Sequence, residues 1–243
     1  MAESTLITTL DEFEAEYRAG LGTWLPAGPR REASLDNIRR FGDGVGDYNP
    51  LWRDREHAER SRFGTITAPP IFIYGANLGI RAAISGAIEG DRLSSQHFPM
   101  NYAGGEITFH LPIWEGDEIT GQEQVVNIAR KHSERIGPFC IATSLTTYHN
   151  QRRELVATKT TNMARYVNLG AGNTMEYDRE SKEQALEVSP DPLVWERERR
   201  GLETRYWDDV VEGESIPKLE KGTYTAVSYT HLRAHETDSY LVC

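Results

Sequence analysis

Hydrophobic residues in the first part of the chain recur every three or four positions, the spacing of a helical face. Leu10, Phe13 and Tyr17 share one face, and Ser34 stands where it can cap a second helix. The apolar positions of that second helix are Leu35, Ile38 and Phe41. The helices expected here span residues 9–19, the run that follows Ser34, and residues 54–62.

Residues 67–88, TAPPIFIYGANLGIRAAISGAI, are apolar nearly all round, which predicts a helix buried inside a domain. Pro69 and Pro70 stand at its start, where proline is favoured. Gly75 and Gly79 lower helix propensity but allow a neighbouring backbone or a ligand to approach closely. We expect this helix to form the axis of the core.

After about residue 104 the pattern changes from helical to alternating. In EITFHLPIW, Ile107, Phe109 and Leu111 fall on one face of a strand, and a corner at Glu115 to Asp117 follows. Three further alternating runs occupy residues 118–134, 136–150 and 154–166. Four strands with short connections predict an antiparallel sheet with the apolar helix lying across it, which is an α+β fold.

Composition narrows the classes of function. The chain has 243 residues, 38% of them hydrophobic, and its apolar runs are too short for a membrane span. A net charge of -10 argues against nucleic acid as a partner. Two cysteines, Cys140 and Cys243, do not make a disulfide framework, and the acidic N-terminus does not read as a secretory signal. We therefore expect a soluble cytoplasmic protein.

The loop FGDGVGDYNPLWRD, residues 41–54, favours a chemical role more than any other segment. Asp47, Asn49 and Pro50 crowd a sharp turn after a helix, where a carboxylate and an amide can be held toward a cleft. Gly-Asp and Asn-Pro are also ordinary turn sequences, so a purely structural turn is the competing interpretation.

The same loop carries a resemblance to a known family. GDYNPLWRD, followed by Ala58, Gly64 and TAPP, resembles the MaoC-like hydratases and dehydratases, whose loop reads Gly-Asp-x-Asn-Pro-x-His-x-Asp before the central helix. Through GGEITFHLPIWEGDEI and HNQRRELVATKT it resembles the N-terminal half of double hot dog proteins labelled FAS1-like dehydratases, over about residues 10–165. The resemblance implies a hot dog fold, in which an antiparallel sheet wraps a long helix.

The activity that this resemblance implies is reversible addition of water to the double bond of a 2-enoyl thioester, usually carried on coenzyme A. In such enzymes an Asp and a His activate the water, and backbone amides near the start of the central helix polarise the thioester carbonyl. No metal or redox cofactor is implied, because coenzyme A or an acyl carrier is part of the substrate. Hot dog domains generally pair through their sheets, so a homodimer or pseudo-dimer is expected.

Three loop positions correspond to the family's functional residues. Asp47 and Asn49 match the catalytic aspartate and the asparagine that follows it, whereas Trp52 takes the place of the histidine. An indole can pack an acyl or pantetheine chain, but it cannot shuttle a proton. The other expected substrate-binding positions, at the start of the central helix, are Pro69, Pro70 and Gly75. The departure at Trp52 predicts that this half is inactive alone.

The resemblance also suggests how the chain is divided. Residues 1–166 form the MaoC-like domain, and residues 167–204 form a polar linker rich in Glu and Arg. Residues 205–226 contain WDDVVEGESIPKLEKGTYT, which resembles the opening of a second hot dog unit that then stops. We expect this second unit to be truncated.

The tail contains THLRAHETD, in which His231 and His235 stand one helical turn apart beside Glu236, as zinc ligands can. However, VSYTHLRAHET matches the translation of a transposase-type library adapter used in short-read sequencing. The final LVC matches the adapter's continuation after a gap of index length. We interpret residues 227–243 as adapter read-through, not native sequence and not a metal site.

Other candidate residues have simpler interpretations. Cys140 lies in a strand run and is expected to be a small buried hydrophobe. The remaining histidines considered, each expected on the surface or in a satisfied core position, are His97, His110, His132 and His149. The basic residues that could meet coenzyme A phosphates, or simply mark solvated strand ends, are Arg130, Lys131, Arg152 and Arg153.

Three alternatives stay open at the level of sequence. Because the sequence does not reveal the acyl group, one is an enzyme of a polyketide or aromatic-compound pathway. A hot dog thioesterase would hydrolyse the thioester, although the Gly-Asp-x-Asn-Pro loop before the central helix favours the hydratase. A noncatalytic half that binds acyl chains or supports a dimer is favoured by Trp52.

Overall fold

The computed structural model describes residues 6–76, 81–88, 92–93, 98–134, 137–167 and 206–214. The chain divides into two compact units. The first comprises Met1–Glu32, Ile73–Pro112 and Glu118–Met175, and the second comprises Ala33–Phe72, Ile113–Asp117 and Glu176–Cys243. The sheet belongs to the first unit, and the candidate loop belongs to the second.

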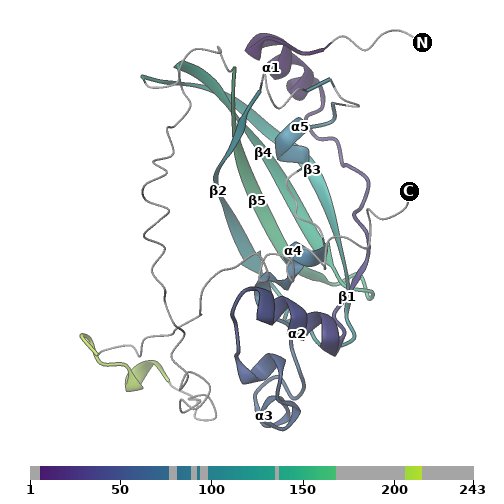
Figure 1. The fold of residues 1–243 in the computed structure, drawn as a ribbon, viewed down its shortest axis with the longest axis vertical. Helices are drawn as coiled ribbons and strands as arrows, with labels where there is room; N and C mark the ends of the chain where they lie inside the picture. Colours follow the sequence, from purple (N-terminus) through teal and green to yellow (C-terminus); the bar gives the residue numbers. More distant parts are fainter. Residues whose placement is uncertain are drawn as a thin grey trace, which may run out of the picture. The chain divides into compact units, whose positions relative to one another are not determined.

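The first unit is built on a five-stranded antiparallel sheet (Figure 1). In spatial order its strands are β1 (Arg31–Glu32), β3 (Glu118–Ser133), β4 (Gly137–His149), β5 (Leu155–Tyr166) and β2 (Met100–Phe109). The alternating pattern predicts β3, β4 and β5 to within a residue at each end. β1 is too short to produce such a pattern and is not predicted.

Side chains along β4 alternate between buried and less buried positions, as expected when one face of a sheet is covered. The buried positions are Cys140, Ala142, Ser144, Thr146 and Tyr148. Cys140 is therefore buried, as predicted, and burial raises the pKa of its thiol. The last three are polar, so the inner face of the sheet is only partly apolar.

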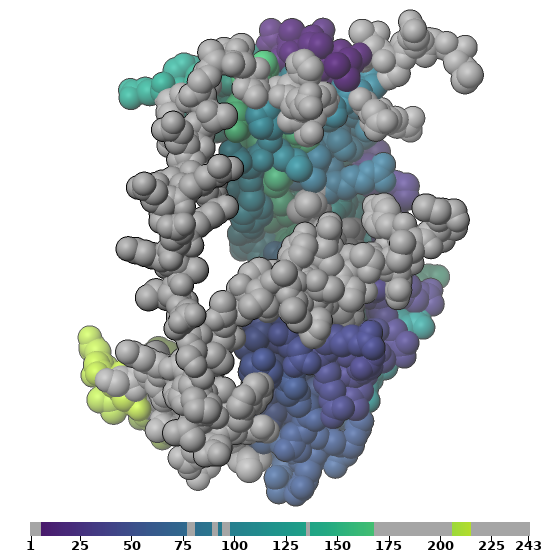
Figure 2. Space-filling view, in the orientation of Figure 1, coloured from purple at the N-terminus to yellow at the C-terminus, as the bar shows by residue number. Residues whose placement is uncertain are grey.

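Helix α1 (Leu10–Ala19) confirms the first predicted helix. It begins with a capping box, in which Glu12 N–H donates to the Thr9 hydroxyl at 3.2 Å and Thr9 N–H donates to the Glu12 carboxylate at 3.0 Å. Its buried face is Leu10, Phe13 and Tyr17. This face packs against β3 and β4, and Figure 2 shows the purple α1 residues next to teal residues of the sheet.

Helix α5 (Arg81–Ser85) packs against β3, β4 and β5 (Figure 1). Two side chains hold its residue Ala82. The Tyr17 hydroxyl donates to the Ala82 carbonyl at 2.6 Å, and the Ala82 N–H donates to Glu123 Oε2 at 2.6 Å. Gly86 follows with φ of 61°, and a Cβ there would lie 2.8 Å from the Tyr17 ring, so only glycine fits this turn.

The predicted central helix, residues 67–88, is described in three pieces. They are a 3-10 turn, η2 (Pro70–Phe72), helix α4 (Ile73–Ala76) and helix α5. The buried residues of these pieces confirm an apolar helical segment that begins at the two prolines. Residues 77–80, including Gly79, lie outside the described residues, so a single continuous helix stays a prediction.

Arg165 on β5 is a buried cation, 3% exposed, whose partners are backbone carbonyls. Its Nη1 donates to the Phe98 carbonyl at 2.7 Å, and its Nη2 donates to the Ile84 carbonyl at 2.6 Å. The guanidinium lies 5.9 Å from the centroid of the Phe13 ring. Burial lowers the pKa of Arg165 to about 10.

Strand β2 differs from its prediction. The alternating pattern places it within EITFHLPIW, residues 106–114, whereas the strand runs from Met100 to Phe109. It begins earlier because residues 100–102 pair with β5 ahead of a bulge that ends at Gly105, and such an irregularity hides alternation in the sequence. Trp114 belongs to the second unit.

The alternating apolar residues at the end of β2 are not a covered face. Ile107 and Leu111 are half-buried, and Phe109 is 45% exposed, so these residues do not form a buried row. β2 is an edge strand whose residues are mostly exposed on both faces. Alternation at an edge therefore did not mark a covered face.

The second unit contains α2 (Leu35–Gly44), η1 (Pro50–Trp52), α3 (Arg55–Arg60) and η2. The Ser34 side chain accepts from the backbone of Asn37, which confirms the predicted cap of α2. Phe41 and Phe72 pack edge to face with ring centroids 5.5 Å apart. Both predicted helices of this unit are confirmed.

Among the described residues, none of the helices combines the length and apolar character that crossing a membrane requires. The predicted linker, residues 167–204, lies outside the described residues except for Val167, and so does the predicted adapter tail, residues 227–243. Of residues 205–226, only 206–214 are described, with a 3-10 turn η5 at Trp207–Asp209. A truncated second hot dog unit stays a prediction.

Candidate active-site loop

The loop between α2 and α3 is fixed by backbone geometry at its start. Gly46 has φ of 64°, a conformation in which glycine is favoured, and the Asp47 N–H donates to the Gly42 carbonyl at 2.8 Å. A Cβ on Gly42 would lie 2.9 Å from the Asp47 carbonyl oxygen. The helix end and the loop therefore approach as closely as two glycines allow, and this sets the position of Asp47.

Asp47 and Asn49 form successive turns with the backbone. Asp47 Oδ1 accepts from the Asn49 N–H at 3.1 Å, and Asn49 Oδ1 accepts from the Leu51 N–H at 3.0 Å. These are the local bonds by which Asp and Asn shape turns, as the structural interpretation of this loop expects. Asp47 is half-buried and Asn49 is exposed, so both side chains retain atoms that a ligand could reach.

Trp52 is buried, with 8% of its surface exposed. Its backbone N–H donates to the Asn49 carbonyl at 3.1 Å, which closes the 3-10 turn η1. Its indole Nε1 is buried and has no hydrogen-bond partner in the described part of the chain. The side chain at the family's histidine position is therefore mainly a packing element.

Arg53 ties the loop to α2. Its guanidinium forms an ion pair with Asp43 and lies 4.9 Å from the centroid of the Tyr48 ring. Its carbonyl accepts from the Arg39 side chain at 3.1 Å. The sequence interpretation missed Arg53, because nothing in the loop sequence marks it as the partner of Asp43.

The predicted substrate-binding positions do not all belong to one unit. Pro69 and Pro70 are in the second unit with Trp52, and the Pro69 carbonyl accepts from the Phe72 N–H at 2.8 Å. Pro69 is buried and Pro70 is exposed. Gly75 belongs to the first unit, where its carbonyl accepts from Arg31 Nε at 2.8 Å.

Histidines of the described residues lie outside the loop's turn. His57, which the sequence interpretation did not single out, is buried on α3. Its backbone N–H donates to the Asp54 carboxylate at 3.1 Å. His110 and His132 are exposed, and His149 is half-buried. His97 lies outside the described residues. His57 could have been noticed because it stands three residues after the Asp54 cap.

Two of the four basic candidates, Arg130 and Arg152, are engaged with acidic neighbours. Arg130 pairs with Asp11 at 2.5 Å and with Glu14 at 2.9 Å, and Arg152 pairs with Glu154 at 2.7 Å. These partners favour the solvated-surface interpretation over a phosphate site for both arginines. Within the described residues, no group of three His, Cys, Asp or Glu side chains is placed to hold a metal. The tail cluster of His231, His235 and Glu236 lies outside them.

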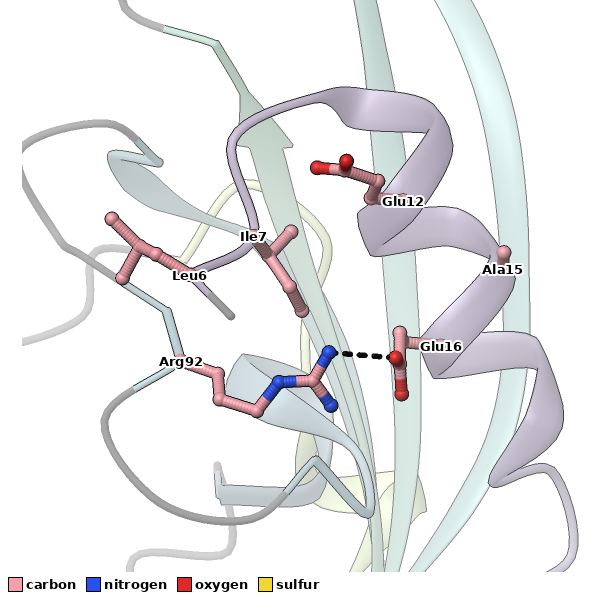
Figure 3. Close-up of a pocket in the computed structure, with 6 residues that line it drawn as sticks. All are labelled: Leu6, Ile7, Glu12, Ala15, Glu16 and Arg92. Carbon is pink, nitrogen blue, oxygen red and sulfur yellow. Dashed lines mark hydrogen bonds and ion pairs between the residues drawn. The ribbon is translucent and has the colours of Figure 1, made fainter. Parts of the chain in front are cut away.

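A shallow pocket of about 230 Å³ lies beside α1 in the first unit (Figure 3). Arg92 donates to Glu16 at 2.7 Å across it, and this hydrogen bond lowers the pKa of the Glu16 carboxyl. Its remaining lining residues are Leu6, Ile7, Glu12 and Ala15. None of the predicted site residues lines this pocket.

The first unit also buries charged residues that sequence reasoning missed. Glu123 on β3 and Lys159 on β5 are 2% and 3% exposed. Burial raises the pKa of Glu123, and burial lowers the pKa of Lys159 to about 8. The Lys159 ammonium lies 4.5 Å from the centroid of the Tyr74 ring. The sequence did indicate the burial of Glu123, because in an alternating strand it faces the same side as the apolar residues Ile119 and Val125.

Comparisons with known proteins agree with this architecture. A solved structure described as a MaoC-like dehydratase superposes with a TM-score of 0.50 at 19% identity, covering 63% of this chain and 44% of that one. Together with the antiparallel sheet and the apolar helices packed on it, this likeness confirms the α+β hot dog fold.

Two curated relatives match in sequence. A probable enoyl-CoA hydratase alpha subunit of Thermomonospora curvata is 28% identical over 168 residues, covering 64% of this chain and 52% of the relative. A UPF0336 protein of Saccharopolyspora erythraea is 28% identical over 99 residues, covering 41% of this chain and 62% of the relative. The chain spans about half the length of the first of these relatives.

The fold and the loop thus define a hot dog protein of the MaoC-like class. The model of the FAS1-like dehydratase domain region matches residues 20–159, more than half of the chain. The chain belongs to this family of hydratases and dehydratases, which confirms the family that GDYNPLWRD indicates.

Proposed function

We propose that the parent protein hydrates a 2-enoyl thioester, or dehydrates a 3-hydroxyacyl thioester, and that this chain is the half that does not transfer the proton. Family membership supports the class of reaction. The name of the relative from Thermomonospora curvata, an enoyl-CoA hydratase subunit, supports coenzyme A as the carrier. Trp52 is the observation that carries the assignment of the inactive half.

Water addition needs a group that accepts a proton from water and a group that returns one to the α-carbon. A histidine can do both, because its ring nitrogens exchange roles as donor and acceptor. The Trp52 indole has one N–H donor and no acceptor, and its Nε1 is buried. Asp47 is left without a proton-exchanging partner at that position and has one carboxylate oxygen bonded to the Asn49 N–H.

For this half, we infer a role in holding the acyl or pantetheine chain of the substrate. Trp52 and Pro69 are buried apolar side chains of the second unit, and Pro70 of the same unit is an exposed, rigid one against which an acyl chain can pack. The working Asp and His pair is assigned to a second hot dog unit, of which residues 205–226 would be the beginning. The greater length of the relative from Thermomonospora curvata supports this division.

The proposal is tested by assaying crotonyl-CoA and longer enoyl-CoAs with this chain and with the full-length parent protein. We expect hydration by the parent only. In the parent, Asp47→Ala should leave the hydration rate unchanged. Binding of a long enoyl-CoA is measured separately. A folded Asp47→Ala parent that loses hydration would show that this half is catalytic.

A matched variant separates packing from chemistry at position 52. Trp52→Phe in the parent keeps an aromatic ring and removes the indole N–H, so hydration should persist and affinity for long acyl chains should change little. Trp52→Ala should weaken binding of the longer enoyl-CoAs more than that of crotonyl-CoA. Equal loss for all chain lengths would contradict an acyl-binding role.

A further inference from the structure

Three polar residues lie side by side on the inner face of the sheet in the first unit. In the strand register Glu123 stands opposite Thr146, and Thr146 stands opposite Lys159. The three are 2%, 0% and 3% exposed. Directly opposed residues on neighbouring strands have Cβ atoms about 5 Å apart, so Thr146 lies between the strand positions of Glu123 and Lys159.

Two atoms of this row have no hydrogen-bond partner among the residues that the structure describes. Glu123 Oε2 accepts from the Ala82 N–H, but Glu123 Oε1 and Thr146 Oγ1 are buried and unpaired. Tyr148 lies near Thr146 on the same face of β4, but no contact of the Thr146 hydroxyl in the described residues has the distance and angles of a hydrogen bond. Leaving such a group unpaired in the interior costs about 1–3 kcal/mol, so two adjacent unpaired atoms indicate a polar occupant.

The charges of the row define what that occupant can be. Glu123 disfavours an anion at this place and Lys159 disfavours a cation, whereas a neutral group that both donates and accepts hydrogen bonds suits both. Electrostatic attraction to Glu123 acts on Lys159, whose ammonium lies over the Tyr74 ring. A buried water typically makes about three hydrogen bonds to otherwise unpaired polar groups.

We propose that Glu123, Thr146 and Lys159 form an internal water-binding site. The water donates hydrogen bonds to Glu123 Oε1 and Thr146 Oγ1 and accepts one from the Lys159 ammonium. Such a bridge supplies the additional hydrogen bonds that a buried pair of opposite charges requires. It links β3, β4 and β5 in one row and, through Glu123, connects them to Ala82 of α5.

Substitution of the threonine tests the site in the full chain. Thr146→Val keeps the shape of the side chain and removes the hydroxyl, and Thr146→Ser keeps the hydroxyl. Oxygen-17 relaxation dispersion reports water molecules held inside a protein. We expect Thr146→Val to lose one long-lived water and Thr146→Ser to keep it, and the folding equilibrium constant of Thr146→Val should fall about three- to tenfold.

Thr147→Val is the matched control, because Thr147 is the next residue of β4 and lies on the opposite face. It should leave the internal water unchanged. A Thr146→Val chain that is as stable as the wild type or more stable would mean that the hydroxyl is dry, since removing an unpaired buried hydroxyl is neutral or stabilising. An unchanged water signal in folded Thr146→Val would equally overturn the site.

Discussion

The Tyr17 hydroxyl donates a 2.6 Å hydrogen bond to the carbonyl of Ala82, joining the N-terminal helix to the helix packed on the sheet. The same oxygen lies 3.2 Å from the Thr143 carbonyl of β4. One hydroxyl has a single hydrogen to donate, and the shorter contact is the one to Ala82. Three elements of the first unit therefore meet at one side chain.

Tyr17→Phe should destabilise the chain by about 1 kcal/mol. The loss is moderate because the Ala82 carbonyl also accepts from the Gly86 N–H at 2.9 Å and so keeps a partner. Urea denaturation of the variant measures the change. Tyr166→Phe is the control, since Tyr166 is half-buried and, within the described residues, its hydroxyl accepts a long 3.4 Å hydrogen bond from the Asn101 side chain. Similar losses in both variants would contradict a specific role for Tyr17.

Gly86→Ala should destabilise the chain more than Gly137→Ala. Both glycines have positive φ, 61° and 72°, so the two substitutions carry a similar backbone penalty. Only at Gly86 would the new Cβ meet a neighbour, the Tyr17 ring at 2.8 Å, whereas nothing lies within 4 Å at Gly137. The difference between their midpoints of thermal unfolding isolates the steric contact. Equal midpoints would show that the ring moves aside at little cost.

Lys159 should make stability rise with pH in the alkaline range. Its pKa is lowered to about 8 by burial, from an ordinary value of 10.5. Between these values the unfolded chain binds more protons than the folded chain, so raising the pH favours the folded state. Below about pH 8 both states are charged and this residue adds no dependence.

Lys159→Met should remove this rise, which is read as the difference between wild-type and variant denaturation midpoints at a series of pH values. Taking the difference cancels the opposite contributions of Tyr17 and Tyr148, whose pKa values are raised by burial. A difference that stays constant from about pH 7 to 10 would mean that Lys159 titrates normally.

Asn49→Ala should cost about 1 kcal/mol, the usual effect of losing a capping side chain. The Asn49 side chain accepts from the Leu51 N–H at the start of η1, and alanine cannot replace that oxygen. Asn49→Asp keeps an acceptor and should retain most of the stability. Chemical denaturation of both variants checks this, and two equally unstable variants would point to a role for the amide nitrogen.

The genomic copy of this gene should diverge from the present sequence after Ala226. This follows from our interpretation of residues 227–243 as translated adapter, and amplification of the locus from source DNA would check it. We expect a coding sequence for a second hot dog unit in its place. A genomic locus that encodes VSYTHLRAHET at this point would refute the interpretation.

Much of the fold could be predicted because its elements have regular patterns. Ser34 marks the start of α2 by its capping chemistry, the spacing of apolar residues marks α1, and β4 alternates over its whole length. β2 could not be placed correctly, since Gly104 and Gly105 interrupt its alternation and only pairing with β5 defines its start. Edge exposure is likewise set by which strand pairs with which, and not by local sequence.

The candidate loop was foreseen in position but not in its internal bonding. Its sequence indicates a turn that carries Asp47 and Asn49, whereas the donor that each side chain accepts from depends on the backbone path. Glu123 and Lys159 were missed because charged residues in a strand usually face solvent. Both residues are buried because they face the side of the sheet on which α5 packs, and this is known only once the strands are assembled.

Arg165 reaches two separate carbonyl groups, those of Ile84 and Phe98, from different nitrogens of one planar group. A lysine would bring the same charge and nearly the same length to this place. Its single nitrogen could not span both acceptors, and its more strongly hydrated ammonium would be costlier to bury. Position 165 therefore requires the planar, branched guanidinium. Arg165→Lys, usually regarded as the mildest substitution of an arginine, is a severe one here.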